Sequence, residues 1–144
     1  MKTKEKTTRK DTREHLAQFH LACELVKVIR HYFPGLPTML KRLEDPRDQR
    51  YITYESHVLL MTRILSSIFY ISSMRKTSQE FNSDTVIENI GYLCGEPELS
   101  ELPYWETIND YLKKLDPGQL QEVVCGVVRR LIRSRAFEDT RVRG

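Results

Sequence analysis

Apolar residues recur along most of this chain at intervals of three or four positions, which is the spacing of one face of an α-helix. The first such segment runs from Thr12 to Tyr32, and Pro34-Gly35 follows it as a stop. Pro37 suits the first turn of a short second helix, which Asp45-Pro46 ends because the residue before a proline resists helical geometry. Residues 47–53 are predicted to be a polar loop.

The most apolar segment, from Glu55 to Ser72, is predicted to be the central helix. Its apolar residues cover more than one face, as in buried helices: Val58, Leu59, Met61, Ile64, Leu65, Ile68 and Phe69. Shorter helices are predicted from Ser73 to Phe81 and from Thr85 to Leu93. Asp84 is the expected cap of the latter, and Gly95 its stop.

Two more amphipathic segments complete the pattern. The first runs from Tyr104 to Leu115, behind an acidic loop from Glu96 to Glu101. The second begins at Pro117, with Asp116 as its N-cap, and its apolar stripe follows a 3.6-residue period: Leu120, Val123, Val124, Val127, Val128, Leu131 and Ile132. Because no segment alternates as a strand would, the predicted fold is all-α, a compact bundle of about six or seven helices.

The chain has 144 residues, of which 40% are hydrophobic, so one modest core is expected. The predicted organisation is a basic flexible arm over residues 1–11, a helical domain over 12–135 and a basic tail over 136–144. The formal net charge is +3 but uneven, since six Lys or Arg face three acids in residues 1–14 and six Arg face two acids in residues 123–144. Two basic ends could bind a phosphate backbone, but a short basic terminus is more commonly just a solvated tail.

Three cysteines lie far apart without a Cys-x-x-Cys spacing, so neither a disulfide framework nor a zinc ribbon is expected. The charged N-terminus lacks the apolar run of a secretory signal. The most apolar stretch is interrupted by polar residues and falls short of the roughly 20 residues that span a bilayer. The expected location is therefore the reducing cytoplasm, without a membrane partner.

The carboxylates and histidines of the chain show no arrangement typical of a catalytic or metal site. Metal-dependent phosphodiester transfer needs carboxylates from separate elements around two metal ions, and no such set is recognisable. The histidines His15, His20, His31 and His57 lack the i, i+4 pairing of metal ligands. No catalytic residue, metal ligand or cofactor is therefore predicted, and the chain by itself is not expected to be an enzyme.

The Tyr104 to Leu115 helix is the first candidate for DNA contact, through its polar and basic residues Tyr104, Thr107, Asn109, Lys113 and Lys114. It would be the third, groove-reading helix of a helix-turn-helix-like unit formed with segments 73–81 and 85–93. The long acidic connection at 96–101 counts against such a unit, because its usual turn has three or four residues. The alternative is a helix that serves packing only, anchored by Tyr104, Trp105, Ile108 and Leu112.

Arg129 and Arg133 are two further DNA-binding candidates. At about 100° per residue they fall opposite the apolar stripe of the last helix, where phosphate positioning and simple solvation are both open interpretations. Cys125, beside that stripe, is expected to be a structural thiol.

The order of several landmarks, from about Leu36 to the end, resembles the N-terminal region of bacterial insertion-sequence DDE transposases. They are Asp45-Pro46-Arg47, the apolar helix after Thr53-Tyr54, Met74-Arg75, Gln79-Glu80-Phe81-Asn82, and the Pro103 to Pro117 run with its Val- and Arg-rich helix. The resemblance implies a helical domain that binds the terminal repeats of the element or supports assembly. It also implies a magnesium-dependent RNase H-like core beyond Gly144, so this chain is expected to end before that core.

Two functions follow from these patterns. The first is the DNA-binding or assembly part of a transposase, which acts in DNA transposition on the terminal repeats without catalytic residues of its own. The second is a standalone helical interaction module or an inhibitory transposase remnant, associating with itself or with full-length transposase. The absent core and an apolar last helix that would lack its natural cover motivate the second function.

Overall fold

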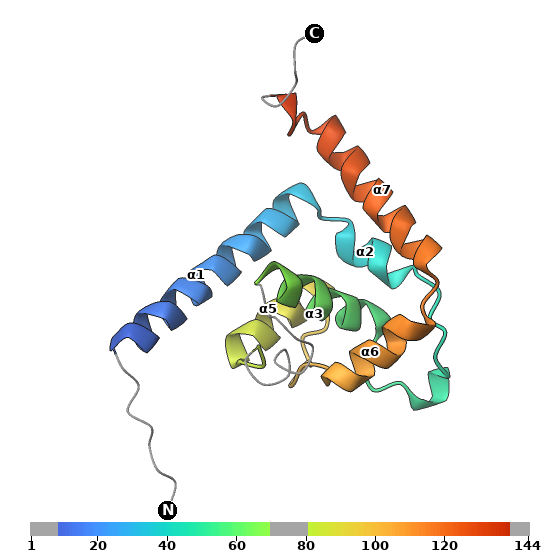
Figure 1. Cartoon of the computed structure of the whole chain (residues 1–144), viewed down its shortest axis with the longest axis horizontal. Coiled ribbons are helices and arrows are strands. Elements are labelled where there is room, and N and C mark those ends of the chain that lie inside the picture. Colours follow the sequence, from blue (N-terminus) through green and yellow to red (C-terminus); the bar gives the residue numbers. More distant parts are fainter. Residues whose placement is uncertain (1–8, 70–80, 139–144) are drawn as a thin grey trace, which may run out of the picture.

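The computed structural model describes residues 9–69 and 81–138, which form six α-helices and one short 3₁₀ helix, with no strand among them (Figure 1). The all-α prediction is confirmed. The elements are α1 (Arg9–Tyr32), α2 (Leu36–Lys41), η1 (Gln49–Tyr51), α3 (Ser56–Ile68), α5 (Asp84–Cys94), α6 (Trp105–Lys114) and α7 (Pro117–Arg133). The helix predicted over residues 73–81 lies outside the described residues except for Phe81.

The hydrophobic core is centred on α3, which packs against α2, α5 and α6. Leu59 and Met61 of α3 are fully buried, as are Ile90 of α5 and Ile108 of α6. The two long terminal helices lie at the edges of this bundle, α1 against α5 and α7 against α2 (Figure 1). The prediction of a central buried helix is therefore confirmed.

Polar side chains of α3 are buried together with its apolar ones. The Thr62 hydroxyl donates to the Val58 carbonyl at 2.8 Å, and the Ser66 hydroxyl donates to the Arg63 carbonyl at 3.0 Å. These bonds to the preceding turn satisfy the hydroxyls within the helix, so their burial costs little. Ile68 was predicted for the core and is instead exposed, because it is the last residue of α3.

Most helix ends follow the local sequence signals. Gly95 closes α5 with a φ of 72°, in the left-handed region that favours glycine. The Asp116 carboxylate caps α7 by accepting a backbone N–H at 3.0 Å. One predicted cap is wrong, because Asp84 is the first residue of α5 and Ser83 takes the cap position. The first helix begins at Arg9, so residues 9–11 of the predicted arm are helical.

The chain folds back tightly onto α5 where the acidic loop begins. The Glu96 N–H donates to the Gly91 carbonyl at 2.8 Å. A Cβ atom on Gly91 would come within 2.7 Å of the Glu96 carbonyl oxygen, closer than non-bonded atoms allow. Glycine at position 91 is therefore what lets the acidic loop follow α5 so closely.

Asp45 and Arg47 form a clamp that holds the loop after α2 against the bundle. Both side chains are largely buried, and a guanidinium nitrogen of Arg47 lies 2.6 Å from a carboxylate oxygen of Asp45. The Arg47 guanidinium also donates to the Tyr54 carbonyl at 2.9 Å. The Arg47 guanidinium lies over the Tyr111 ring of α6, 5.1 Å from its centroid. Burial by itself raises the pKa of Asp45, but the hydrogen bonds from Arg47 outweigh it and hold that pKa below its usual value.

Candidate functional site

The helix α6 is fixed to α3 through one apolar face. Ile108 and Tyr111 are buried, and Leu112 packs partly against the core. Tyr104, directly before the helix, is instead exposed. The packing interpretation therefore describes Ile108 and Leu112 correctly, whereas Tyr104 does not anchor the helix.

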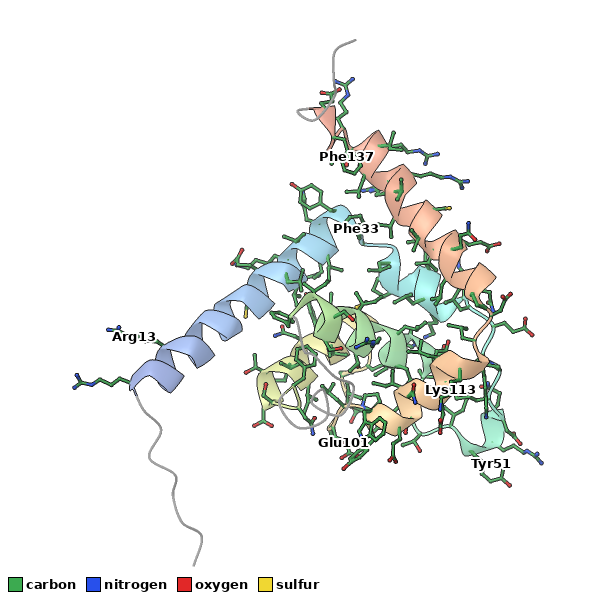
Figure 2. All side chains as sticks on the ribbon, in the orientation of Figure 1. Arg13, Phe33, Tyr51, Glu101, Lys113 and Phe137 are labelled. Carbon is green, nitrogen blue, oxygen red and sulfur yellow. The ribbon has the colours of Figure 1, made fainter. Side chains whose placement is uncertain are left out.

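The five predicted DNA-binding residues of this segment differ in exposure. Tyr104, Lys113 and Lys114 are exposed, whereas Thr107 and Asn109 are half-buried. Lys113 lies at the end of α6 from which the chain turns into α7 (Figure 2). The two lysines therefore adjoin the start of α7, while Tyr104 lies at the other end of α6.

The charges of α6 largely cancel one another. Glu106 and Asp110 share the helix with Lys113 and Lys114, and the Lys113 ammonium lies 3.5 Å from the Asp110 carboxylate. Both partners of that pair are exposed, so it contributes little to stability. A helix without net positive charge also attracts a phosphate backbone only weakly.

An acidic pocket of about 270 Å³ lies between the start of α3 and the loop that leads into α6. Its carboxylates come from four glutamates: Glu55, Glu96, Glu98 and Glu101. The Tyr54 hydroxyl donates to Glu101 at 3.0 Å, and burial together with that carboxylate raises the pKa of Tyr54 to about 12. Glu101 lies near the N-terminal end of α6 (Figure 2). Phosphate is repelled there, so the lysine end of α6 is better suited to DNA than the Tyr104 end.

Arg129 and Arg133 are exposed on α7, as the helical pattern predicted. This helix carries three arginines against one glutamate, Glu122. The third arginine, Arg130, donates from Nε to the Tyr32 carbonyl at 3.3 Å and so joins α7 to the end of α1. Sequence reasoning missed this contact, because nothing local to Arg130 indicates which carbonyl will come near it.

The apolar stripe of α7 is only half covered. Val123 is buried, and Leu120 and Val127 pack partly against the core. Val124, Val128 and Ile132 are 59%, 42% and 60% exposed, and these three residues are called the bare strip below. Cys125 beside them is exposed as well, so its predicted role as a structural thiol is wrong.

The predicted DNA-binding residues form two groups rather than one compact site. Lys113 and Lys114 precede α7, and Arg133 is the last residue of that helix. At about 1.5 Å per residue, Arg129 and Arg133 lie about 18 and 24 Å along the α7 axis from Pro117, whereas Lys113 and Lys114 belong to the end of α6. Any one ligand that contacts both groups must therefore be as long as α7.

Cys94 and His57 are neighbours in the core, but they do not form a reactive pair. The Cys94 thiol lies 3.9 Å from the His57 backbone carbonyl, and the His57 Nε2 atom lies 3.2 Å from the Cys94 carbonyl. Burial, with a smaller contribution from Glu96, raises the pKa of Cys94 to about 12. The thiol therefore stays protonated at neutral pH and is a poor nucleophile.

Within residues 9–69 and 81–138, no three His, Cys, Asp or Glu side chains come together in a way that could hold a metal ion. None of the described helices has the length and hydropathy needed to cross a membrane.

No protein-family model matches the chain, and no curated protein or solved structure is significantly similar to it.

Proposed function

We propose that this chain is the DNA-binding and assembly part of a DDE-type transposase, acting on the terminal repeats of a mobile element. The order of sequence landmarks from Asp45-Pro46-Arg47 to Pro117 supports this function. The observation that carries the proposal is a pair of exposed basic groups near the two ends of α7, namely Lys113 and Lys114 at the end of α6, and Arg129 and Arg133 in the last turns of α7. Two separated basic groups suit an extended polyanion.

In this proposal, the two basic groups bind phosphates and fix the register of the duplex. The helix α7 separates the lysines at the end of α6 from the arginines in its own last turns, so the two groups contact the backbone at two places. Phosphate contacts carry no sequence information. Recognition of the terminal repeats is therefore assigned to the uncharged polar residues Thr107 and Asn109, because Tyr104 lies at the end of α6 where the acidic pocket repels phosphate.

The test is the salt dependence of DNA binding, measured by fluorescence anisotropy with a duplex of the element's terminal repeat. The logarithm of the association constant should fall linearly with the logarithm of salt concentration. The double variant Arg129→Gln and Arg133→Gln removes two phosphate contacts, so the magnitude of the slope should fall by about 2. Binding to the terminal repeat should also exceed binding to a scrambled duplex.

A matched control is the double variant Arg42→Gln and Arg50→Gln, which changes the net charge equally at exposed positions outside the proposed site. Its slope should remain close to that of the unchanged chain. An equal slope for all three proteins would refute the assignment to α7. Equal, weak affinity for both duplexes would remove specific recognition, and no measurable binding at low salt would remove DNA binding altogether.

The bare strip favours a second candidate function, namely protein interaction as a standalone module or an inhibitory transposase remnant. Exposed apolar strips on helices commonly mark interaction sites. If this is the function, co-expression of the chain should lower the transposition frequency of the full-length transposase in cells. Val128→Lys should abolish that inhibition, whereas an inhibition that survives in this variant would exclude the bare strip as its cause.

A further inference from the structure

We propose that Arg130 is a positioning residue of the DNA-binding surface, which fastens the outer turns of α7 to the end of α1 and so keeps Arg129 and Arg133 turned outward. The inference rests on the proposed DNA binding for its functional consequence. Its structural basis is the hydrogen bond from the Arg130 Nε to the Tyr32 carbonyl, at 3.3 Å, where the end of α1 lies beside α7 (Figure 1).

The Tyr32 carbonyl is an acceptor that α1 cannot satisfy by itself. Tyr32 is the last residue of α1, and the carbonyls in the last turn of a helix have no partner within that helix. The Phe33 N–H, directly after the helix, donates to the Ile29 carbonyl, which leaves Tyr32 for a donor from elsewhere. A positive charge at this end also interacts favourably with the helix dipole. Arg130 therefore supplies both a donor and a charge that stabilise the end of α1.

The apolar packing of α7 is concentrated in its first half. The residues of its stripe that are covered are Leu120, Val123 and Val127. In the same region α7 comes so close to α2 that a Cβ atom on Gly126 would lie 3.0 Å from the Met39 Sδ. Arg130 follows Gly126 by about one turn. Its bond to α1 is therefore a second attachment, which fixes the direction of the outer turns.

The place of Arg130 around the helix suits this role. At about 100° per residue, Arg129 and Arg133 share one side of α7, and Val123 and Val127 lie about 120° further round, on the packed side. Arg130 falls between these two sides. A bond at this place opposes rotation of α7 about its own axis, and the outward direction of the other two arginines depends on that rotation.

Salt dependence distinguishes a positioning residue from a phosphate ligand. Each phosphate contact that is lost lowers the magnitude of the salt slope by about 1. Arg130→Gln removes a hydrogen bond from a charged donor, so the association constant for the terminal-repeat duplex should fall about fivefold while the slope stays the same. Arg129→Gln removes a phosphate contact, so its slope should fall by about 1.

A distance measurement without DNA tests the attachment itself. Spin labels on Cys125 of α7 and on a Val28→Cys variant of α1, both exposed positions, report the separation of the two helices by pulsed electron paramagnetic resonance. Cys23→Ser removes a second thiol that is not fully buried, and Cys94 is buried and does not take the label.

Arg130→Gln should widen the distribution of distances, because the outer turns of α7 are then held to α1 less firmly. Arg129→Gln is the matched control, since it removes the same charge one residue away but keeps the bond to Tyr32. Its distribution should match that of the unchanged chain, and circular dichroism should show that both variants are folded.

Three results would overturn the inference, namely an Arg130→Gln variant whose distance distribution is unchanged, whose DNA affinity is unchanged, or whose slope falls by about 1. The last result would make Arg130 a phosphate ligand and leave the proposed function intact. If the unchanged chain binds no DNA at low salt, the proposed function fails, and the role assigned to Arg130 fails with it.

Discussion

The bundle around α3 and the helix α7 use similar apolar residues in opposite ways. Leu59 and Met61 of α3 are fully buried, whereas Val124 and Ile132 of α7 are more than half exposed. The difference comes from their neighbours, since α3 packs against α2, α5 and α6, whereas α7 packs mainly on α2. A helical apolar stripe therefore indicates that a helix forms a contact, but not that the contact lies within the same chain.

The largest expected effect contrasts the two regions directly. Leu59→Ala leaves a cavity at a fully buried position and should lower the free energy of unfolding by about 3 kcal/mol. Val124→Ala on the bare strip should change it by less than about 0.5 kcal/mol. Urea unfolding measures both values. Equal losses would mean that Val124 is packed as tightly as Leu59.

A smaller effect is expected at the fold-back of the acidic loop onto α5. Gly91→Ala brings a methyl group against the Glu96 carbonyl oxygen, so the backbone must shift, at a cost of about 2 kcal/mol. Gly35→Ala is the matched control, because a Cβ atom at that position meets nothing within 4 Å. Thermal unfolding should separate the two variants. A similar melting temperature for both would show that the loop does not press on α5.

The Asp45–Arg47 clamp is expected to contribute about 1.5 kcal/mol, which Asp45→Asn should remove. The pKa of Asp45 is lower in the folded chain than in the unfolded chain. This stabilisation is therefore fully present above the unfolded pKa of 3.8 and is lost as the pH falls through the lower folded value. The difference in unfolding free energy between the two proteins should thus stay constant from neutral pH to about pH 5 and shrink below about pH 4.

Asp48→Asn is the control for this experiment, because Asp48 forms the same kind of pair with Arg50 at an exposed site. Exposed pairs contribute little, so this variant should resemble the unchanged chain at every pH. A pH-independent loss in Asp45→Asn would show that the carboxylate charge is not what holds the clamp.

The smallest expected effect is confined to α7. Asp116→Ala removes the N-cap and should cost about 1 kcal/mol, whereas Asp116→Asn keeps an acceptor oxygen and should cost less. Amide hydrogen exchange should show faster exchange in the first turns of α7 and an unchanged rate in α3. Faster exchange in both helices would mean that α7 and the core unfold as one unit.

Helices and their ends could be predicted from sequence because the signals are local. Apolar spacing located α3 and α7, Gly95 ended α5, and Asp116 capped the last helix. Each signal acts through backbone geometry and hydrogen bonds within a few residues. The exposure of Arg129 and Arg133 followed from the same spacing.

Only the tertiary structure decided which surfaces are covered. The Glu44 N–H donates to the Gln119 side chain at 2.7 Å across 75 residues, and Arg130 reaches the Tyr32 carbonyl across 98. No local pattern encodes such partners, so the division of the α7 stripe into a packed half and a bare strip was not predictable, nor was the burial of Arg47 against Tyr111. Burial depends on which remote elements come together, whereas helix formation depends on neighbours along the chain.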